Sequence, residues 1–153
     1  MKRAEALRPL SREHLAALLA ARKLRAADDV ATATREFLTF WNDEGRRHFR
    51  IEEEVLLPGW AAYGELDRDG VGRMLEEHLA IRREVLRLQA GELSIGQIHL
   101  LGDLLHDHVR FEERVLFVAA EEALDASSLA RLATAIDAAE AVGRSPGAPR
   151  TEG

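Results

Sequence analysis

The sequence contains no cysteine. This absence excludes disulfide bonds, thiolate catalysis, iron–sulfur clusters and cysteine-based zinc sites, and it fits a reducing compartment. Aromatic residues are also scarce, at 5% of the chain, and no run of alternating β-branched residues occurs. Alanine and leucine dominate instead, so the composition predicts an all-α fold.

Long hydrophobic runs and an excess of positive charge are missing as well. No segment approaches about 18 continuous apolar residues, and the charged N-terminus does not resemble a signal peptide. The formal net charge is −6, with acidic and basic residues interspersed. We therefore expect a cytoplasmic protein with neither a membrane nor a nucleic-acid partner.

The chain is long enough, at 153 residues, for one domain with a substantial core. Apolar spacing predicts four long helices and a short fifth helix at the C-terminal end. The four cover residues 11–27, 30–57, 71–90 and 94–124, and the fifth ends near residue 142. Residues 1–142 would then form the domain. Residues 143–153, rich in glycine and proline, are predicted to be a disordered tail.

The predicted helix ends follow from capping and breaking residues. Ser11, Asp29 and Ser94 precede apolar-periodic segments and are the predicted N-caps. Pro58 and Gly59 are predicted to stop the second helix, because proline has no amide hydrogen to continue it.

Two short segments occur twice and contain four of the six histidines. The sequence EHLA stands at residues 13–16 and again at 77–80. The sequence HFRIEEEVLL at 48–57 is matched by HVRFEERVLF at 108–117. The order EHLA, then H-x-x-x-E, is therefore repeated at nearly the same separation, which indicates two related halves.

Histidine and glutamate four residues apart lie on one face of a helix. Here they interrupt faces that are otherwise apolar, and a buried carboxylate is costly unless a cation holds it. Imidazole and carboxylate together form a ligand set for iron, manganese or zinc. The candidate metal ligands are His14, His48, Glu52, His78, His108 and Glu112.

The number of these ligands suits two metal ions. If both carboxylates and a solvent-derived oxo or hydroxo group bridge the ions, each ion has two nitrogen and three oxygen contacts. A sixth octahedral position then stays open for a small molecule, whereas structural zinc sites are usually closed and four-coordinate. The ligand set favours iron, with manganese second and zinc third. The alternative to a metal site is that these histidines and glutamates form surface helix caps and i,i+4 pairs. That interpretation is much weaker here because the motif is duplicated.

Several neighbours of the candidate ligands have two possible roles. Glu53, Glu54 and Glu113 adjoin them in the chain but are expected to face solvent as charged groups. Glu44 is either a hydrogen-bond partner of a ligand imidazole or an ordinary surface charge. Gly45 either lets another helix approach or leaves space for a diatomic ligand, and close helix packing is the favoured interpretation.

Two further histidines and a methionine are expected to have supporting roles. His106 lies two residues before His108 and so points away from it around the helix. A surface or supporting role is favoured for His106, and a surface position for His99. Met74 is expected to fill the core beside the metals rather than to act as a thioether ligand.

The two H-x-x-x-E blocks resemble the hemerythrin-like domain, also called the HHE cation-binding domain. The resemblance covers about residues 11–120 and is most specific at 48–58 and 108–117. It implies an up-and-down four-helix bundle with a non-haem di-iron centre. It also implies that the four repeated histidines are terminal ligands and that Glu52 and Glu112 are bridging carboxylates.

The match is closer to one branch of that family than to the oxygen carriers. Oxygen-carrier hemerythrins have five histidines, with H-x-x-x-H on the third helix and an aspartate five residues after the last histidine. Here Met74 stands four residues before His78, and Glu112 stands four after His108. The chain resembles four-histidine, two-glutamate members, such as di-iron proteins of the nitrosative-stress response and the iron- and oxygen-sensing domain of a ubiquitin-ligase subunit.

The leading hypothesis is therefore a di-iron protein that binds or senses O2, NO or peroxide, or reports iron status under such stress. A second hypothesis is a di-iron redox enzyme of the NO reductase, oxidase or peroxidase type. A third is a structural or interaction bundle with an incidental metal site or a zinc site. The sequence contains no motif that identifies a redox or protein partner.

Overall fold

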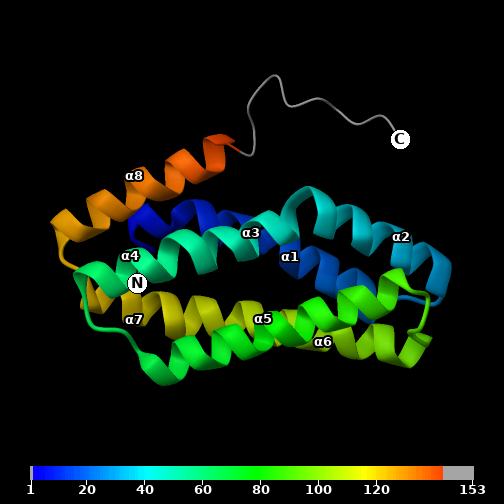
Figure 1. Ribbon diagram of the computed structural model, residues 1–153. Coiled ribbons are helices and arrows are strands. Elements are labelled where there is room, and N and C mark those ends of the chain that lie inside the picture. The colour runs from blue at the N-terminus through cyan, green and yellow to red at the C-terminus, as the bar shows by residue number, and fades with distance from the viewer. Residues whose placement is uncertain (1, 143–153) are drawn as a thin grey trace.

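The computed structural model describes residues 2–142, and every regular element in this range is helical (Figure 1). The α-helices are α1 (Arg8–Arg25), α2 (Val30–Phe40), α3 (Arg46–Ile51), α4 (Leu57–Tyr63), α5 (Arg68–Gln89), α6 (Ile95–Phe111), α7 (Phe117–Ala123) and α8 (Ala126–Val142). A 3₁₀ turn, η1 (Glu5–Leu7), precedes α1, and the π-helical turns are η2 (Trp41–Gly45), η3 (Glu52–Leu56) and η4 (Glu112–Leu116). The all-α prediction is confirmed, and the predicted tail at 143–153 lies outside the described residues.

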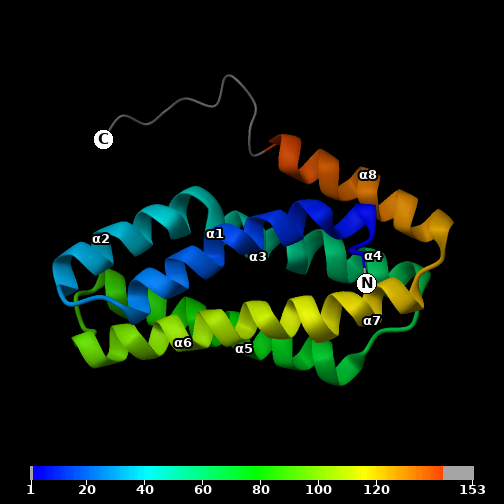
Figure 2. The ribbon, with the colours of Figure 1, turned by 180° about the vertical axis from the view of Figure 1, so that it is seen from behind.

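The π-helical turns join short helices into long rods. Residues 30–63, from α2 to α4, form one continuous rod, and residues 95–123, from α6 to α7, form another. These two rods lie alongside α1 and α5, each of which is a rod by itself. Along the chain, successive rods run in opposite directions (Figures 1 and 2). Helix α8 packs against η1, η3 and α4. No described helix is long and apolar enough to cross a membrane.

Two of the three predicted N-caps are confirmed. The side chain of Asp29 accepts a hydrogen bond from the amide of Thr32, with N and O 2.9 Å apart. Ser94 and Gln97 form a reciprocal capping box at the start of α6. Ser11 is not a cap, because α1 begins earlier, at Arg8, with a proline in its first turn. A proline is tolerated there since the first amides of a helix have no partner within it.

The prediction that Pro58 stops the second helix is wrong. The rod continues through α4 to residue 63, and Pro58 lies in the first turn of that helix. The preceding turn is π-helical, so the amide of Leu57 donates to the carbonyl of Glu52, five residues back. Such a wide turn leaves a main-chain carbonyl without an amide partner, which is where a proline without an amide hydrogen is accommodated.

The same wide turns change which side chains face the interior. In a regular helix Val55 and Val115, three residues after Glu52 and Glu112, would lie on the same buried face as these glutamates, but Val115 is 48% exposed. Leu56 and Leu116, one residue further along, are fully buried in their place. Each π-helical turn contains one extra residue, so the buried face shifts by one position after it.

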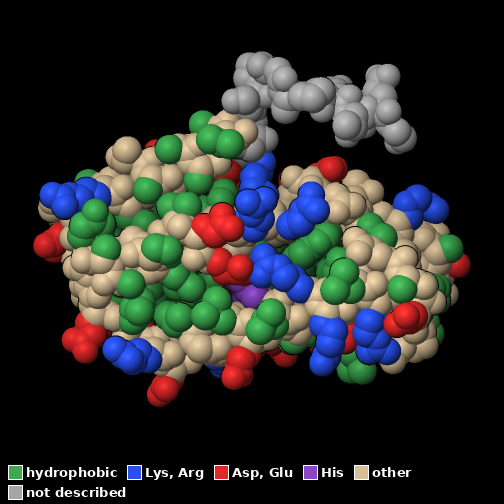
Figure 3. Space-filling view, in the orientation of Figure 1, with side chains coloured by type: hydrophobic (Ala, Val, Ile, Leu, Met, Phe, Trp, Pro, Cys, Tyr) green, Lys and Arg blue, Asp and Glu red, His purple; other side chains and the backbone are tan. Residues whose placement is uncertain are grey.

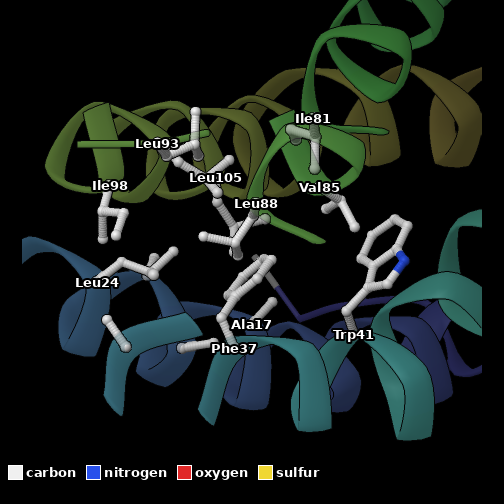
Figure 4. Packing of buried hydrophobic residues seen from close by; sticks show 14 of the residues in the cluster. Ala17, Leu24, Phe37, Trp41, Ile81, Val85, Leu88, Leu93, Ile98 and Leu105 are labelled. Atoms are coloured by element: carbon white, nitrogen blue, oxygen red, sulfur yellow. The ribbon is translucent and has the colours of Figure 1, made fainter. Parts of the chain in front are cut away.

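Two clusters of buried apolar residues fill the interior, and the candidate ligands fall between them. One cluster occupies the end of the molecule formed by α2 and the start of α6, and includes Leu24, Phe37 and Leu88 (Figure 4). The other includes Trp60 and Met74, which are fully buried. On every rod the candidate ligand stands where one cluster gives way to the other, so apolar packing closes the site at both ends.

Candidate metal centre

The structure brings the six candidate ligands together from four separate rods. The four histidines lie on α1, α3, α5 and α6, and Glu52 and Glu112 are the first residues of η3 and η4. All six side chains are buried, and Glu52, Glu112 and His108 have no exposed surface. They form two groups able to hold a metal ion, each with ligand atoms within 4.8 Å of one another: His14, His48, Glu52 and Glu112, and Glu52, His78, His108 and Glu112.

The two glutamates belong to both groups, and each lies between histidines of different groups. Glu52 Oε1 is 3.1 Å from His48 Nε2 and 3.5 Å from His78 Nε2. Glu112 Oε1 is 3.0 Å from His108 Nε2 and 3.2 Å from His14 Nε2. Ligands that bind one ion with bonds of about 2.0–2.2 Å at right angles are separated by about 3 Å. The spacing therefore suits two adjacent ions that share both carboxylates.

The Nδ1 atom of each of these histidines faces away from the centre and donates its proton to an outer carboxylate. The Nδ1–Oε distances are 2.6 Å for His14–Glu113, 3.1 Å for His48–Glu13, 2.5 Å for His78–Glu53 and 3.0 Å for His108–Glu77. Such a hydrogen bond fixes the tautomer of a metal-binding histidine and aims the lone pair of Nε2 inward.

The inward-facing atoms provide the test of whether a metal fits. The four Nε2 atoms and the four carboxylate oxygens of Glu52 and Glu112 are all buried, and none has a hydrogen-bond partner among residues 2–142. With the protons held on Nδ1, nitrogen lone pairs face carboxylate oxygens at about 3 Å, a repulsive arrangement unless a cation lies between them. The donor set and its orientation therefore fit metal ions.

Two expectations for the neighbouring glutamates are wrong and one is confirmed. Glu53 and Glu113 do not face solvent as free charges, because each binds the histidine of another rod. Glu54 is exposed and pairs with Arg50, as expected. Adjacent residues on a helix point about 100° apart, so the residue beside a ligand reaches a neighbouring rod. The sequence did contain a signal for these contacts, because an acidic residue adjoins a candidate ligand at repeat-related positions in both halves. These residues are Glu13, Glu77, Glu53 and Glu113.

An arginine completes each of these histidine–carboxylate pairs on its outer side. The pairs are Arg47 with Glu13, Arg82 with Glu53, Arg73 with Glu77 and Arg3 with Glu113, with N–O distances from 2.5 to 3.4 Å. In Figure 3, histidine surface is visible as a small patch framed by acidic and basic side chains. The negative charge of each outer carboxylate is thus balanced by an arginine outside and an imidazole inside.

Two of the arginines also hold aromatic rings against the histidines. Arg3 lies 5.5 Å from the ring centroid of Phe117, which stacks on His14. Arg82 lies 5.4 Å from the centroid of Phe49, whose ring is 3.8 Å from that of His78 and nearly parallel to it. His14 and His78 are related by the internal repeat, but the arginines and the aromatic residues beside them do not occupy equivalent repeat positions.

The sequence model of the family described as the hemerythrin HHE cation binding domain matches residues 5–120. The chain belongs to this family. No curated protein and no solved structure matched the chain. The family match contains the six candidate ligands and their four outer carboxylates, and it ends before α8.

The outer carboxylates of this hemerythrin-family site are charged. Burial alone would raise the pKa of Glu113, but the hydrogen bond from His14 and the charge of Arg3 lower that pKa to about 2. The pKa of Glu13 is likewise lowered to about 2, mainly by its hydrogen bond with His48, against the effect of burial. Both side chains therefore carry a full negative charge near neutral pH.

The two shared carboxylates behave differently because they are fully buried and close to each other. Burial and the charge of Glu112 raise the pKa of Glu52 to about 8. Burial would lower the pKa of His108, but the charge of Glu112 raises it to about 10. In the metal-free cluster, protons take the place that cations would occupy.

The remaining residues singled out in the sequence lie around the centre. His99 is half-buried and donates to the carbonyl of Ala27, 2.7 Å away, while His106 pairs with Asp107. Both lie outside the two groups, as expected. Met74 fills the core, also as expected. Glu44 is exposed and lies in the wall of a small cavity beside the histidines.

The favoured interpretation of Gly45, close packing of another helix, is wrong. A Cβ atom at this position would meet Cε3 of Trp41 at 2.9 Å and ring atoms of Phe40 at 3.1 and 3.2 Å. The glycine therefore makes room for two aromatic rings of its own rod. Gly45 also lines the small cavity.

Proposed function

We propose that this hemerythrin-family protein holds two iron ions between the four histidines and the two shared glutamates. In this proposal the described rods are the four helices of an up-and-down bundle, α8 is an added helix, and residues 1–142 form the domain. The observation that carries the proposal is the set of eight buried, inward-facing ligand atoms without hydrogen-bond partners among the described residues. Their division into two groups that share Glu52 and Glu112 supports two adjacent ions.

Iron is favoured over zinc by the kind and number of ligands. Each group offers two imidazole nitrogens and two carboxylates, whereas structural zinc sites are usually closed by four ligands and often by cysteine. The absence of cysteine and the mixed nitrogen and oxygen ligands suit iron, with manganese as the second choice. A cytoplasmic location, where ferrous iron is accessible, is part of the proposal.

The role that we propose is binding or sensing of O2, NO or peroxide, or of iron itself. Two adjacent ferrous ions, if held by these ligands, would be able to supply two electrons to a small molecule. The protein contributes the orientation of the imidazoles through their outer carboxylates, and exclusion of water by the two apolar clusters. Loss of iron would leave the buried ligands without a cation, so the stability of the fold would also report iron supply.

A redox enzyme of the NO reductase or peroxidase type is the second candidate. The observation in its favour is that the two groups share both carboxylates, which keeps the ions close enough to act on one substrate. Catalytic consumption of NO or peroxide by the iron-loaded protein, measured against stoichiometric binding, distinguishes the two roles. A structural bundle with an incidental site predicts that stability is indifferent to iron removal.

Elemental analysis of the untagged protein, produced with sufficient iron and never exposed to chelator, tests the metal proposal. We expect about two irons per chain, and fewer than half as many in Glu112→Ala. Glu54→Gln is the matched control, because this glutamate is exposed and pairs only with Arg50 among the contacts of the described chain. One zinc per chain, or no metal after ferrous reconstitution, would overturn the proposal.

A further inference from the structure

Helix α8 lies beyond residues 5–120, the part of the chain that the family model matches. It packs against η1, which precedes α1, and against the rod that contains α3, η3 and α4 (Figures 1 and 2). Its buried residues follow one face of the helix at a spacing of four residues: Ser128, Leu132, Ile136 and Glu140. A glutamate that is only 8% exposed thus continues an apolar face. Burial of a carboxyl group is costly unless it has polar partners.

The partners of Glu140 are two residues that hold His48 from the outside. Its Oε2 atom lies 3.9 Å from Nη2 of Arg47, and its carboxyl group shares a hydrogen bond with Glu13. Arg47 also pairs with Glu13, with nitrogen and oxygen 3.4 Å apart. Glu13 in turn accepts the Nδ1 proton of His48, at 3.1 Å. A chain of contacts therefore leads from α8 to a candidate ligand through a single carboxylate.

The proton in the hydrogen bond between the two glutamates belongs to Glu140. Two carboxyl groups form such a bond only if one of them is protonated. Glu13 accepts from His48 and pairs with Arg47, so it is the ionised acceptor and Glu140 is the donor. The donated proton and the charge of Arg47 together hold the carboxylate of Glu13 in place. That carboxylate fixes the direction in which Nε2 of His48 points.

The equivalent glutamate of the second half is held differently. Glu77, the repeat equivalent of Glu13, binds His108 and pairs with Arg73 of its own helix. The side chain of Arg73 is 54% exposed, whereas that of Arg47 is 25% exposed. Helix α8 thus covers the outer ion pair of one half and leaves the equivalent pair more open to solvent.

This difference falls on one of the two groups of candidate ligands. His48 belongs to the group with His14, whereas His108 belongs to the group with His78. The internal repeat makes the ligands of the two groups alike, but the contact from α8 reaches only the first of these pairs through Glu13. The two metal positions are therefore unequal in their outer support.

We propose that α8 supports one of the two metal positions, and that Glu140 transmits this support to His48 through Glu13. Glu140 is a positioning residue, because it acts on the ligand through another side chain. Loss of its contact should weaken the ion beside His48 and leave the other ion in place. The inference rests on the proposed function where metal is concerned, but the contact from α8 to His48 exists without metal.

Two substitutions of Glu140 separate positioning from packing. Glu140→Leu extends the apolar face formed by Leu132 and Ile136 and so keeps α8 packed, but it has no donor for Glu13. Glu140→Gln is similar in shape and keeps an N–H donor. If the role is packing alone, the leucine variant should behave like the wild type or better. Asp137→Asn, at an exposed position of the same helix, is the matched control.

The first measurement is titration of each metal-free protein with ferrous iron under anaerobic conditions, in competition with a chelator of known affinity. Glu140→Leu should weaken one ion about tenfold, the lower end of the range for groups that orient metal-binding histidines, and leave the other unchanged. Glu140→Gln and Asp137→Asn should resemble the wild type. Unchanged affinities in Glu140→Leu, equal weakening of both ions, or a loss in Glu140→Gln as large as in Glu140→Leu would each overturn the proposal.

A readout that needs no metal separates this inference from the proposed function. In nuclear magnetic resonance spectra of the metal-free protein, the Nδ1 protons of His48 and His108 report their hydrogen bonds with the outer carboxylates. Glu140→Leu should shift the His48 signal or accelerate its exchange with water, and leave the His108 signal in place. Glu140→Gln and Asp137→Asn should change neither signal.

The two readouts together assign any failure. If the wild type binds no iron while the His48 signal responds to Glu140→Leu, the proposed function fails and the support from α8 stands. If the wild type binds two irons while Glu140→Leu changes neither the affinities nor the His48 signal, the support from α8 fails alone. Absence of iron together with an unchanged His48 signal would overturn both.

Discussion

Glu13 precedes His14 in the chain but binds His48, with Oε1 of the glutamate 3.1 Å from Nδ1 of the histidine. The repeat-related Glu77 likewise precedes His78 and binds His108, at 3.0 Å. Each EHLA segment therefore offers a candidate ligand from its histidine and orients a ligand on another rod through its glutamate. Because of this crossing, removal of one outer carboxylate should affect a ligand on a different helix.

Glu77→Gln tests the orienting role of the outer carboxylates. The amide oxygen can still accept from His108, but the negative charge that supports the imidazole is lost. We expect metal affinity to fall about 10- to 100-fold, the range typical of such partners, with the helical content unchanged. Competition with a chelator of known affinity measures the change. Glu54→Gln is the control, and equal affinities of the two variants would contradict the prediction.

Arg3→Ala tests the contact between the N-terminal segment and the centre. Arg3 binds Glu113 and Glu121 and lies over the ring of Phe117. Because these groups are partly shielded from solvent, we expect a loss of about 1 kcal/mol in the free energy of unfolding of the metal-loaded protein. Urea denaturation provides the measurement. Arg12→Ala, on the exposed side of α1, should have little effect, and similar losses for both variants would argue against a specific contact.

Removal of the metal should destabilise the wild type, whereas Glu52→Leu should lose that response. The buried ligands lose their cation on chelation, so the midpoint of thermal unfolding should fall. Because the pKa of Glu52 is raised to about 8, its metal-free side chain is mostly protonated near neutral pH, and an apolar side chain of similar size replaces a polar group whose burial is costly. Metal-free Glu52→Leu should thus be at least as stable as the metal-free wild type.

Met74→Ala is the contrasting variant for that experiment. This side chain is fully buried in the core, so its truncation should cost about 2–5 kcal/mol with or without metal. Calorimetry of both variants with and without chelator separates the two effects. Chelator-dependent stability in Glu52→Leu as large as in the wild type would show that Glu52 does not hold the ion.

The N-cap of α2 should make stability depend on pH. Hydrogen bonds from the hydroxyl and the amide of Thr32 lower the pKa of Asp29 below its ordinary value of 3.8. A carboxylate whose pKa is lower in the folded state stabilises the fold above its unfolded pKa, and this contribution is lost as the pH falls through the folded pKa. Asp29→Ala should therefore unfold at a lower temperature than the wild type near neutral pH.

The difference should narrow as the pH is lowered below the ordinary value of 3.8 for aspartate. Thermal unfolding of the metal-free proteins across this range provides the measurement. Asp28→Ala, an exposed neighbour, is the control and should show no such convergence. A constant difference between Asp29→Ala and the wild type at all pH values would show that the charge of Asp29 does not act through the cap.

The sequence alone determined the class of fold and selected the residues of the candidate centre. Alanine- and leucine-rich apolar spacing indicated helices. The N-caps at Asp29 and Ser94 could be predicted because a cap depends only on hydrogen bonds to amides a few residues away. The duplicated H-x-x-x-E pattern selected six residues that the structure brings into one buried cluster, although their role as ligands remains a prediction. These features depend on the period of a helix and on residue chemistry, and both can be inferred from short stretches of sequence.

Only the tertiary structure decided what lies around those six residues. Glu53 and Glu113 were expected in solvent, but they bind histidines on other rods because neighbouring residues of a helix point toward different neighbours. The wide turn η4 buried Leu116 in place of Val115, since its extra residue shifts the buried face of the helix by one position. The contact of Arg3 with Glu113 and the cavity beside Ala17 and Gly45 depend on how separate rods meet. That information is not contained in the period of any one helix, because it depends on side chains distant in the chain.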